Sequence, residues 1–310
     1  MSTLTPLSHL AQSDVDNFYK LSPEERKFFM AQTGIGDDAE LKQHIVSVAD
    51  EAFGIYPYET IRVFAFTRLV ISKFPAYQDV KRLGTERPGA LFLDLGCCFG
   101  NDIRMLVSEG FPPEQCIASD IKPEFWDLGH KLFRSTPRSF PVHFIGGDVL
   151  DPANLSIHPF NSGNGEVDKF SPVSKASSLN DLKGQLSAIH VSSLFHLFTE
   201  PQQLHLARAL AGLLVPKPGC VIFGMHPAKK VKGVYTGMPP NNHTIFSHSP
   251  ESWMQMWEEK VFGPGSGNDG AVIKVHAKLF EIPRGMVRYK VDDDGGALYM
   301  MAWSVRVVSC

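Results

Sequence analysis

Three carboxylates in the first half of the chain stand where they could bind one ligand together. Asp94 lies near the end of the apolar run "ALFLDLG", Asp120 ends "CIASD", and Asp148 follows "VHFIGG". Gly96 and Gly100 frame a turn between the first two acids, in "LGCCFGND". Glycines let a backbone approach a ligand closely, and an acid about 20 residues beyond such a turn can accept from both ribose hydroxyls. The spacing therefore predicts a nucleoside site.

The same acids discriminate between nucleoside cofactors. Three acids on one rim repel a pyrophosphate, but they suit a cofactor with a ribose, an adenine and a cationic tail, which describes S-adenosylmethionine. The sequence has no G-x-x-x-x-G-K-[ST] segment to cradle a triphosphate. An NADP-dependent reductase is disfavoured because the turn lacks G-x-G and because Asp120 would repel a 2′-phosphate. S-adenosylmethionine is therefore the expected cofactor, with S-adenosylhomocysteine as its product.

Two neighbouring cysteines, Cys97 and Cys98, occupy the middle of the turn. The chain has 5 cysteines, an odd number, and no C-x-x-C pair, so neither a disulfide framework nor a zinc site is indicated. We expect reduced thiols in a cytoplasmic protein. The acidic run "DDDGG" at 292–296 lies between two β-rich runs and is interpreted as a hairpin turn, so no metal is predicted.

The bulk composition is that of a globular protein, with 310 residues, 43% hydrophobic and 20% charged. The formal net charge of -3 argues against a nucleic-acid partner. The start "MSTLTPLSHLAQSD" lacks the features of a signal peptide, and no apolar run approaches the ~18 residues of a membrane span. We expect no membrane insertion, and the oligomeric state stays open, a homodimer being one option.

Alternating strands and helices from about residue 88 must position the acids. This alternation predicts an α/β fold with a doubly wound, mostly parallel Rossmann-like sheet over 86–310. The last two β-rich runs, "AVIKVHAKLFEI" and "ALYMMAWSVRVV", should pair as an antiparallel hairpin. Long loops are expected at 156–181 and 226–263, the second ending in a helix capped by Ser249.

A helical cap over 1–85 is expected to precede this core. In "LSPEERKFFMAQTG", Ser22 is a suitable N-cap, Pro23 suits the first helical position and Gly34 is a stop signal. "DDAELKQHIVSVADEAFG" places its apolar residues on one helical stripe, and "YETIRVFAFTRLVISKF" predicts a third, more buried helix.

Five segments together resemble the successive motifs of class I S-adenosylmethionine-dependent methyltransferases: "LDLGCCFGND", "ASDI", "GGDVLDP", "IHVSSLFHLF" and "LLVPKPGCVIFG". More narrowly, "DLGCCFG" and "SLFHLF", with "GIYPYETIRVFAF" upstream and "HSPESWMQMWEE" downstream, are similar to the fungal isoprenoid (meroterpenoid) O-methyltransferases. Members of that family methylate carboxyls of terpenoid and meroterpenoid intermediates. The usual methyltransferase turn has a third glycine where Cys98 stands, and the narrower family accepts cysteine there.

The resemblance implies a role for each motif residue. Asp120 would hold the ribose beside the adenine, Asp148 would meet the adenine edge, and Gly96 would pack against the methionine part while Asp94 attracts its ammonium. Tyr58 precedes the core and is expected to close over the cofactor. The complete predicted cofactor-binding set is Asp94, Gly96, Cys97, Cys98, Gly100, Asp120, Ile121, Asp148, Val149, His190, Tyr58 and Arg62.

The expected reaction is methyl transfer to a carboxyl or hydroxyl of a hydrophobic small molecule, a terpenoid or meroterpenoid of secondary metabolism. A carboxylate is ionised near pH 7 and needs no base, whereas a hydroxyl would use one. His196, after the fourth expected strand, and His226, after the fifth, are the candidate catalytic bases. Trp253 and Trp257, at i and i+4, are interpreted as core or as a wall of the substrate pocket. The alternatives are an N- or S-methyltransferase of another small molecule and a catalytically silent, cofactor-binding partner subunit.

Overall fold

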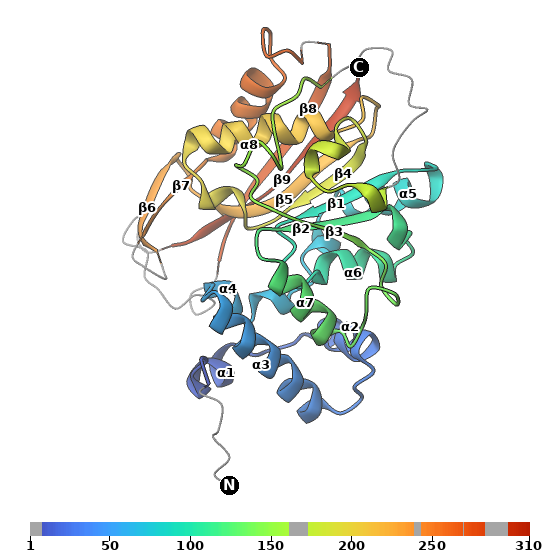
Figure 1. The fold of residues 1–310 in the computed structure, drawn as a ribbon. Coiled ribbons are helices and arrows are strands. Elements are labelled where there is room, and N and C mark those ends of the chain that lie inside the picture. Colours follow the sequence, from blue (N-terminus) through green and yellow to red (C-terminus); the bar gives the residue numbers. More distant parts are fainter. Residues whose placement is uncertain (1–7, 161–172, 239–242, 269, 283–296) are drawn as a thin grey trace.

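A sheet of 7 strands forms the centre of the molecule in a computed structural model that describes residues 8–160, 173–238, 243–268, 270–282 and 297–310 (Figure 1). Its strand order is β3-β2-β1-β4-β5-β9-β8. The first five of these strands pair in parallel, and β9 pairs antiparallel with both β5 and β8. The strands are β1 (Leu91–Leu95), β2 (Cys116–Asp120), β3 (His143–Gly146), β4 (Leu186–Val191), β5 (Val221–Ala228), β8 (Val272–Glu281) and β9 (Tyr299–Ser309). The predicted fold class, including the C-terminal antiparallel hairpin, is confirmed.

The chain order along this sheet reverses between β1 and β4. From β1 the sheet grows through β2 to β3, and the chain then returns to place β4 on the other side of β1. Open α/β sheets bind ligands at the carboxyl ends of the strands beside such a reversal. A ligand crevice is therefore expected beyond the carboxyl ends of β1 and β4.

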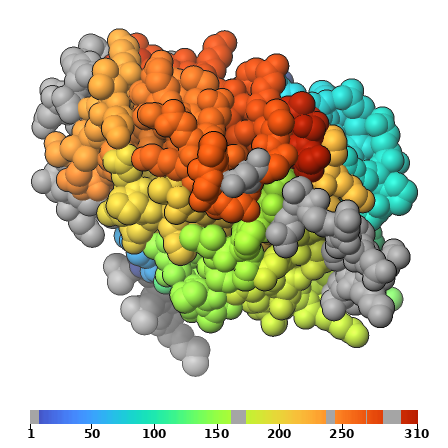
Figure 2. Space-filling model, turned by 90° about the horizontal axis from the view of Figure 1, so that it is seen from above, coloured from blue at the N-terminus to red at the C-terminus, as the bar shows by residue number. Residues whose placement is uncertain are grey.

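Helices cover both faces of the sheet. On one face, α5 (Tyr77–Glu86), α6 (Asn101–Ser108) and α7 (Pro123–Leu132) share a hydrophobic cluster with the N-terminal helices, which lie below α7 in Figure 1. On the other face, α8 (Glu200–Leu213) and α9 (Pro250–Gln255) form a second cluster, and α9 continues as a π-helical segment, η8 (Met256–Val261). Figure 2, seen from above, shows α8 in yellow and the segments after it in orange to red.

The N-terminal segment begins as the sequence predicts. It contains α1 (Gln12–Phe18), α2 (Pro23–Thr33) and α3 (Asp38–Ile55). Ser22 and Glu25 form the capping box of α2, and Gly34 ends the helix with a φ of 70°. The described apolar stripe of α3 is buried against the rest of the molecule. The proposed domain boundary near residue 85 itself stays a prediction.

The third predicted N-terminal helix is wrong. Only α4 (Glu59–Arg62) is helical, and the 3-10 turns η1 (Ala65–Thr67) and η2 (Ile71–Lys73) follow it. The segment is rich in β-branched residues, which lower helix propensity, and Phe64 breaks the path with a φ of 52°. Two backbone groups of this segment instead form hydrogen bonds with α6. Asn101 donates to the carbonyl of Phe66, and the Ile71 N–H donates to Asp102.

Both predicted loop insertions carry structure that the sequence analysis missed. Within 226–263, β5 runs on through Ala228, and β6 (Gly233–Met238) pairs with β7 (His243–Ser247) as an antiparallel hairpin. The predicted Ser249 cap of α9 is confirmed. In the described part of 156–181, the 3-10 turns are η5 (Val173–Lys175) and η6 (Leu179–Leu182). Residues 161–172 and the predicted turn at 292–296 lie outside the described residues.

Candidate active site

The predicted acids lie at the carboxyl ends of neighbouring strands. Asp94 is in β1 and is opposite His190 of β4, and Asp120, the last residue of β2, is opposite Gly146 of β3. Asp148 lies two residues beyond the end of β3. Parallel strands end at the same edge of a sheet, so these acids lie together at the edge where the strand order reverses.

The glycine turn is tied to the neighbouring strand and then starts a helix. The N–H groups of Gly96 and Cys97 donate to the carbonyl of Ser119 (2.8 and 3.1 Å). Gly100 has a φ of 73° and directly precedes α6. A Cβ at Gly100 would lie 2.6 Å from the ring of Trp126, so only glycine fits this position.

Cys98 adopts the left-handed geometry of the glycine that it replaces, with a φ of 50°. Its N–H donates to Oδ2 of Asp120 (2.9 Å), and the N–H of Lys122 donates to Oδ1 of the same carboxylate (2.9 Å). Each carboxylate oxygen keeps a further lone pair for a ligand. Burial raises the pKa of Asp120, against the opposing effect of these backbone hydrogen bonds. Asp120 is therefore held in one orientation by the turn.

The two cysteines of the turn are free thiols. Burial, with further contributions from Asp120 and Asp94, raises the pKa of Cys97 and of Cys98. Protonated thiols are poor nucleophiles and poor metal ligands. Among the described residues, no group of three or more His, Cys, Asp and Glu side chains could hold a metal ion. Both cysteines are therefore parts of the turn rather than reactive groups.

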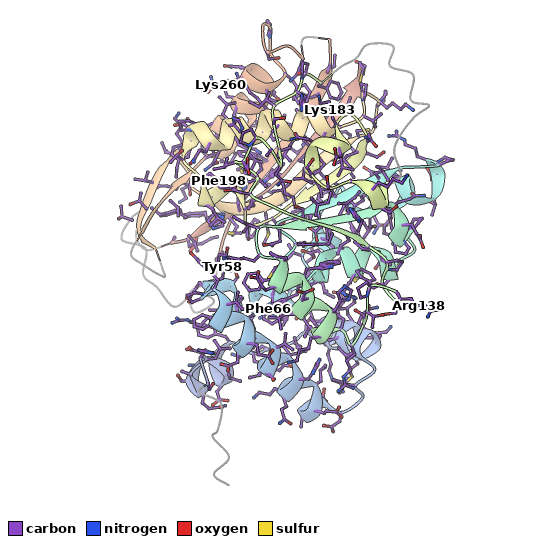
Figure 3. The ribbon with its side chains drawn as sticks, viewed as in Figure 1. Tyr58, Phe66, Arg138, Lys183, Phe198 and Lys260 are labelled. Atoms are coloured by element: carbon purple, nitrogen blue, oxygen red, sulfur yellow. The ribbon has the colours of Figure 1, made fainter. Side chains whose placement is uncertain are left out.

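Tyr58 reaches the turn from the N-terminal helices. Its ring centroid lies 4.4 Å from that of Tyr56 and 5.7 Å from that of Phe125 on α7. Burial, and then the negative charge of Asp120, raises the pKa of Tyr58 to about 12. Figure 3 shows Tyr58 where the N-terminal helices meet the rest of the molecule. Arg62, by contrast, stacks on Phe53 within those helices (4.8 Å).

The predicted adenine-side residues differ in what they offer a ligand. Asp148 is exposed, and one of its oxygens accepts from the Leu150 N–H (2.8 Å). Ile121 is 51% exposed, whereas Val149 is buried. The side chains of Asp148 and Ile121 are thus accessible at the rim, and Val149 can contribute mainly its backbone.

Four polar residues, Asp94, Asp102, His190 and Ser192, form a partly buried cluster that was not foreseen as a unit. Asp94 Oδ1 is 2.8 Å from Nδ1 of His190, and His190 Nε2 is 2.8 Å from Oγ of Ser192. Asp102, on α6, accepts from the Ile71 N–H (3.0 Å). Sequence position gave no signal for this cluster, because its members come from two strands, a helix and the N-terminal segment.

The charges of this cluster influence one another. Burial raises the pKa of Asp102 to about 6; His190 opposes this shift and Asp94 adds to it. Burial alone would lower the pKa of His190, but the hydrogen bond and charge of Asp94 and the charge of Asp102 together raise it. The two carboxylates therefore favour the protonated form of His190.

His226 is buried within the sheet, with 1% of its surface exposed. It lies within β5, not after it, and is opposite Met301 of β9. Trp303 Nε1 donates to His226 Nδ1 (3.0 Å). Because an indole only donates, the proton of a neutral His226 must be on Nε2. Burial lowers the pKa of His226 well below its usual value, so the ring is a neutral donor.

The surroundings of His226 lie on the face of the sheet opposite Asp94. Its ring packs against Trp253 (4.6 Å between centroids), and both Trp253 and Trp257 are fully buried in the α8–α9 cluster. The core interpretation of the two tryptophans is therefore supported. His196 lies in the half-buried 3-10 turn η7 (Phe195–Leu197) after β4.

A cavity of about 360 Å³ lies apart from the turn, between α8 and α9. Its lining includes Glu200, Lys232, His248, Ser252 and Lys260, and none of the strand-end acids. An ion pair of 3.0 Å joins Lys232 to Glu200 across it. This cavity is therefore separate from the candidate cofactor site.

Comparisons with known proteins identify the family of this chain. Residues 14–67 match a family model described as the meroterpenoid methyltransferase N-terminal domain. The chain is 30% identical over 237 residues to the O-methyltransferase phiE of a fungal species, covering 76% of this chain and 70% of that protein. The chain belongs to the fungal meroterpenoid methyltransferase family. It is an S-adenosylmethionine-dependent methyltransferase of class I.

Two further matches give the extent of the similarity. This methyltransferase is 30% identical over 264 residues to the Asnovolin E/Chermesin D methyltransferase nvfJ of Aspergillus novofumigatus, covering 84% of this chain and 86% of that one. A solved structure, the 1,6-didemethyltoxoflavin-N1-methyltransferase of Burkholderia thailandensis, is 13% identical with a TM-score of 0.44, covering 94% of this chain and 92% of that one. The family match over 14–67 spans most of the N-terminal helices, which are thus a family feature. Among the described residues, no helix is long and apolar enough to cross a membrane.

Proposed function

We propose that this methyltransferase transfers a methyl group from S-adenosylmethionine to an oxygen of a hydrophobic terpenoid or meroterpenoid. One observation carries the cofactor assignment: Asp120 is clamped by two backbone N–H groups of the glycine turn and its neighbour, yet keeps lone pairs directed away from them. Such a carboxylate suits the two hydroxyls of a ribose. When bound, the cofactor supplies an electrophilic methyl group on a sulfonium.

The residues at the strand ends fit the parts of this cofactor. In the proposal, Asp120 binds the ribose, the exposed Asp148 meets the adenine amino group, and Ile121 covers the adenine ring. Gly96, which has a φ of 75°, approaches the methionine part without a side chain. Asp94 attracts the ammonium with its second oxygen, because the first is bonded to His190.

The acceptor side is proposed to be apolar. Tyr56 at the end of α3 is 39% exposed and Leu197 after β4 is 47% exposed. Tyr56 contacts Tyr58, which lies near Asp120, so apolar surface borders the crevice. The similarity to nvfJ, an Asnovolin E/Chermesin D methyltransferase, and the family matched by residues 14–67 support a meroterpenoid as the acceptor class.

The need for a base depends on the acceptor atom. Ionised carboxylates attack without one, and the protein then mainly holds the two reacting groups in line. A hydroxyl acceptor would need a base, and of the two histidines proposed from sequence only His196 stays a candidate. The free cysteines support a reducing compartment, and we propose the cytoplasm.

A mass-spectrometric screen tests the proposal. The purified protein is incubated with trideuteromethyl-labelled S-adenosylmethionine and a panel of terpenoid acids, phenols and amines. The proposal expects a labelled methyl ester or ether. A label on nitrogen or sulfur would favour the alternative enzyme, and S-adenosylhomocysteine binding without any turnover would favour a silent partner subunit.

A further inference from the structure

We infer that Ser192 binds a carboxylate of the methyl acceptor and that the protonation state of His190 decides whether Ser192 can do so. This inference rests on the proposed function, because it places the acceptor at the end of β4 beside the methionine part of the cofactor. Ser192 is an acceptor-positioning residue here, and His190 acts through it.

The geometry is a chain of hydrogen bonds from β1 to the crevice. Asp94 binds one ring nitrogen of His190 at 2.8 Å, and the other ring nitrogen lies 2.8 Å from Ser192 Oγ. The N–H of Met225 also donates to Ser192 Oγ (3.2 Å). His190 is 2% exposed and packs against Phe74 and Phe223, with centroids 5.8 and 5.2 Å away. The ring therefore has a single orientation.

Counting donors shows what the protonation of His190 changes. The Ser192 hydroxyl has one hydrogen and two lone pairs. The Met225 N–H occupies one lone pair in either state. When His190 is doubly protonated, its Nε2–H occupies the second lone pair, so the hydroxyl hydrogen of Ser192 must point to another acceptor. When His190 is neutral with Nδ1–H on Asp94, Nε2 takes that hydrogen and Ser192 offers only a lone pair.

The loop that carries Ser192 lies against the glycine turn. A Cβ at Gly96 would lie 3.6 Å from Leu194 Cδ1, so the two loops are in contact. Ser193 has a φ of 52°, and its N–H donates to the Met225 carbonyl (2.7 Å). This anchor fixes Ser192 at the carboxyl end of β4, next to the part of the turn that is proposed to hold the methionine portion.

The charges around His190 favour its protonated form. Asp94 binds it from β1, and the charge of Asp102 acts on it from α6. Among the described residues, the rings that pack against it from the N-terminal segment and from β5 are the uncharged Phe74 and Phe223. The two carboxylates raise the pKa of His190 despite its burial. A carboxylate ligand thus meets a donor that is backed by a cation, and charge-assisted hydrogen bonds of this kind are strong.

Acceptor binding is expected to weaken as the pH rises. The acceptor carboxylate stays ionised above about pH 5, and Asp102, with its pKa of about 6, is largely ionised above pH 7. Above pH 7, His190 is therefore the member of this cluster whose charge changes. Deprotonation turns the Ser192 hydroxyl back toward the ring, and acceptor binding weakens. We expect the acceptor KM to rise as pH rises through the raised pKa of His190, whereas affinity for S-adenosylhomocysteine changes much less.

The test compares Ser192→Ala with Ser192→Thr, which keeps the hydroxyl, and with Ser193→Ala as a neighbouring control. Ser192→Ala is expected to raise the acceptor KM about ten- to a hundred-fold, to lose the pH dependence of KM, and to leave the S-adenosylhomocysteine Kd unchanged. Ser192→Thr is expected to restore both properties, and Ser193→Ala to resemble the wild type. An unchanged KM and pH profile in Ser192→Ala would overturn the inference.

A second readout does not depend on turnover. Nitrogen-15 NMR of the histidine rings in the whole protein follows the protonation of His190 directly. A His190 that titrates below about pH 6.5 would overturn the inference even if methyl transfer is established. A wild-type rate that rises with pH through this titration would overturn it too, since Ser192 would then accept a proton. Absence of S-adenosylhomocysteine binding would instead contradict the proposed function.

Discussion

Asp120→Asn should weaken cofactor binding far more than it weakens the fold. In the wild type, each oxygen of Asp120 accepts one backbone N–H at 2.9 Å, from Cys98 and from Lys122. An asparagine has one oxygen and one NH2 group, so one of these N–H groups must face a donor. Loss of a hydrogen bond to a charged acceptor costs about 1.5–3 kcal/mol.

Two further effects determine how much Asp120→Asn lowers the free energy of unfolding. Burial raises the pKa of Asp120, because desolvation disfavours its ionised form. An asparagine avoids this desolvation cost, which offsets part of the free energy lost with the hydrogen bond. Cys98 is held in the left-handed region at a cost of roughly 1–2 kcal/mol. Its hydrogen bond to residue 120 is therefore the weaker of the two and should break first. We therefore expect the free energy of unfolding to fall by only about 1 kcal/mol.

The substitution should weaken cofactor binding more than it weakens the fold, because both the ribose contact and the shape of the turn change. We expect a loss of about 3 kcal/mol, or roughly a hundred-fold in the Kd of S-adenosylhomocysteine measured by isothermal titration calorimetry. Asp127→Asn, on the exposed side of α7, is the matched control and should bind as the wild type does. An Asp120→Asn variant that binds within three-fold of the control, a difference of about 0.7 kcal/mol, would refute this reasoning.

Four further substitutions test the turn, the polar cluster and His226. Cys98→Gly should raise the free energy of unfolding by about 1 kcal/mol in denaturant titration, because glycine tolerates a positive φ, whereas Cys97→Gly should lower it. Asp102→Asn should stabilise the protein above pH 6, on the order of 2 kcal/mol, because the raised pKa of about 6 marks a penalty on the ionised form; the gain should vanish as pH falls toward 4. His226→Phe should lower the free energy of unfolding by about 1–3 kcal/mol, because Trp303 Nε1 loses its acceptor. We expect kcat to stay nearly unchanged. A hundred-fold fall in the kcat of a folded variant would support His226 as a base.

The sequence predicts those site residues whose positions depend on a short local segment. Asp94 and Asp120 lie in the last two residues of their strands and Asp148 lies just after a strand, and parallel strands bring their carboxyl ends to one edge. The glycine turn is similarly local, since Gly96 and Gly100 lie within one strand–turn–helix unit. A sequence pattern therefore suffices to bring these residues together.

The remaining features depend on contacts between distant segments. The neighbour of Asp94 is His190, 96 residues away, and no local pattern connects them. His226 looked like a residue of a loop, but pairing with β9 extends β5 past it and buries its ring beside Trp303. The segment after α4 failed as a helix because its backbone N–H groups and carbonyls bind α6 instead.

Hydrogen–deuterium exchange with and without S-adenosylhomocysteine tests the central claim most directly, since it reports where the cofactor binds. Protection is predicted in peptides that contain the glycine turn at 95–101, the β2 end at 119–122, the β3 end at 146–150 and the β4 end at 190–194. Peptides at 248–260, which line the cavity between α8 and α9, should exchange as they do without the ligand. Protection confined to 248–260, with none at the glycine turn, would contradict the account.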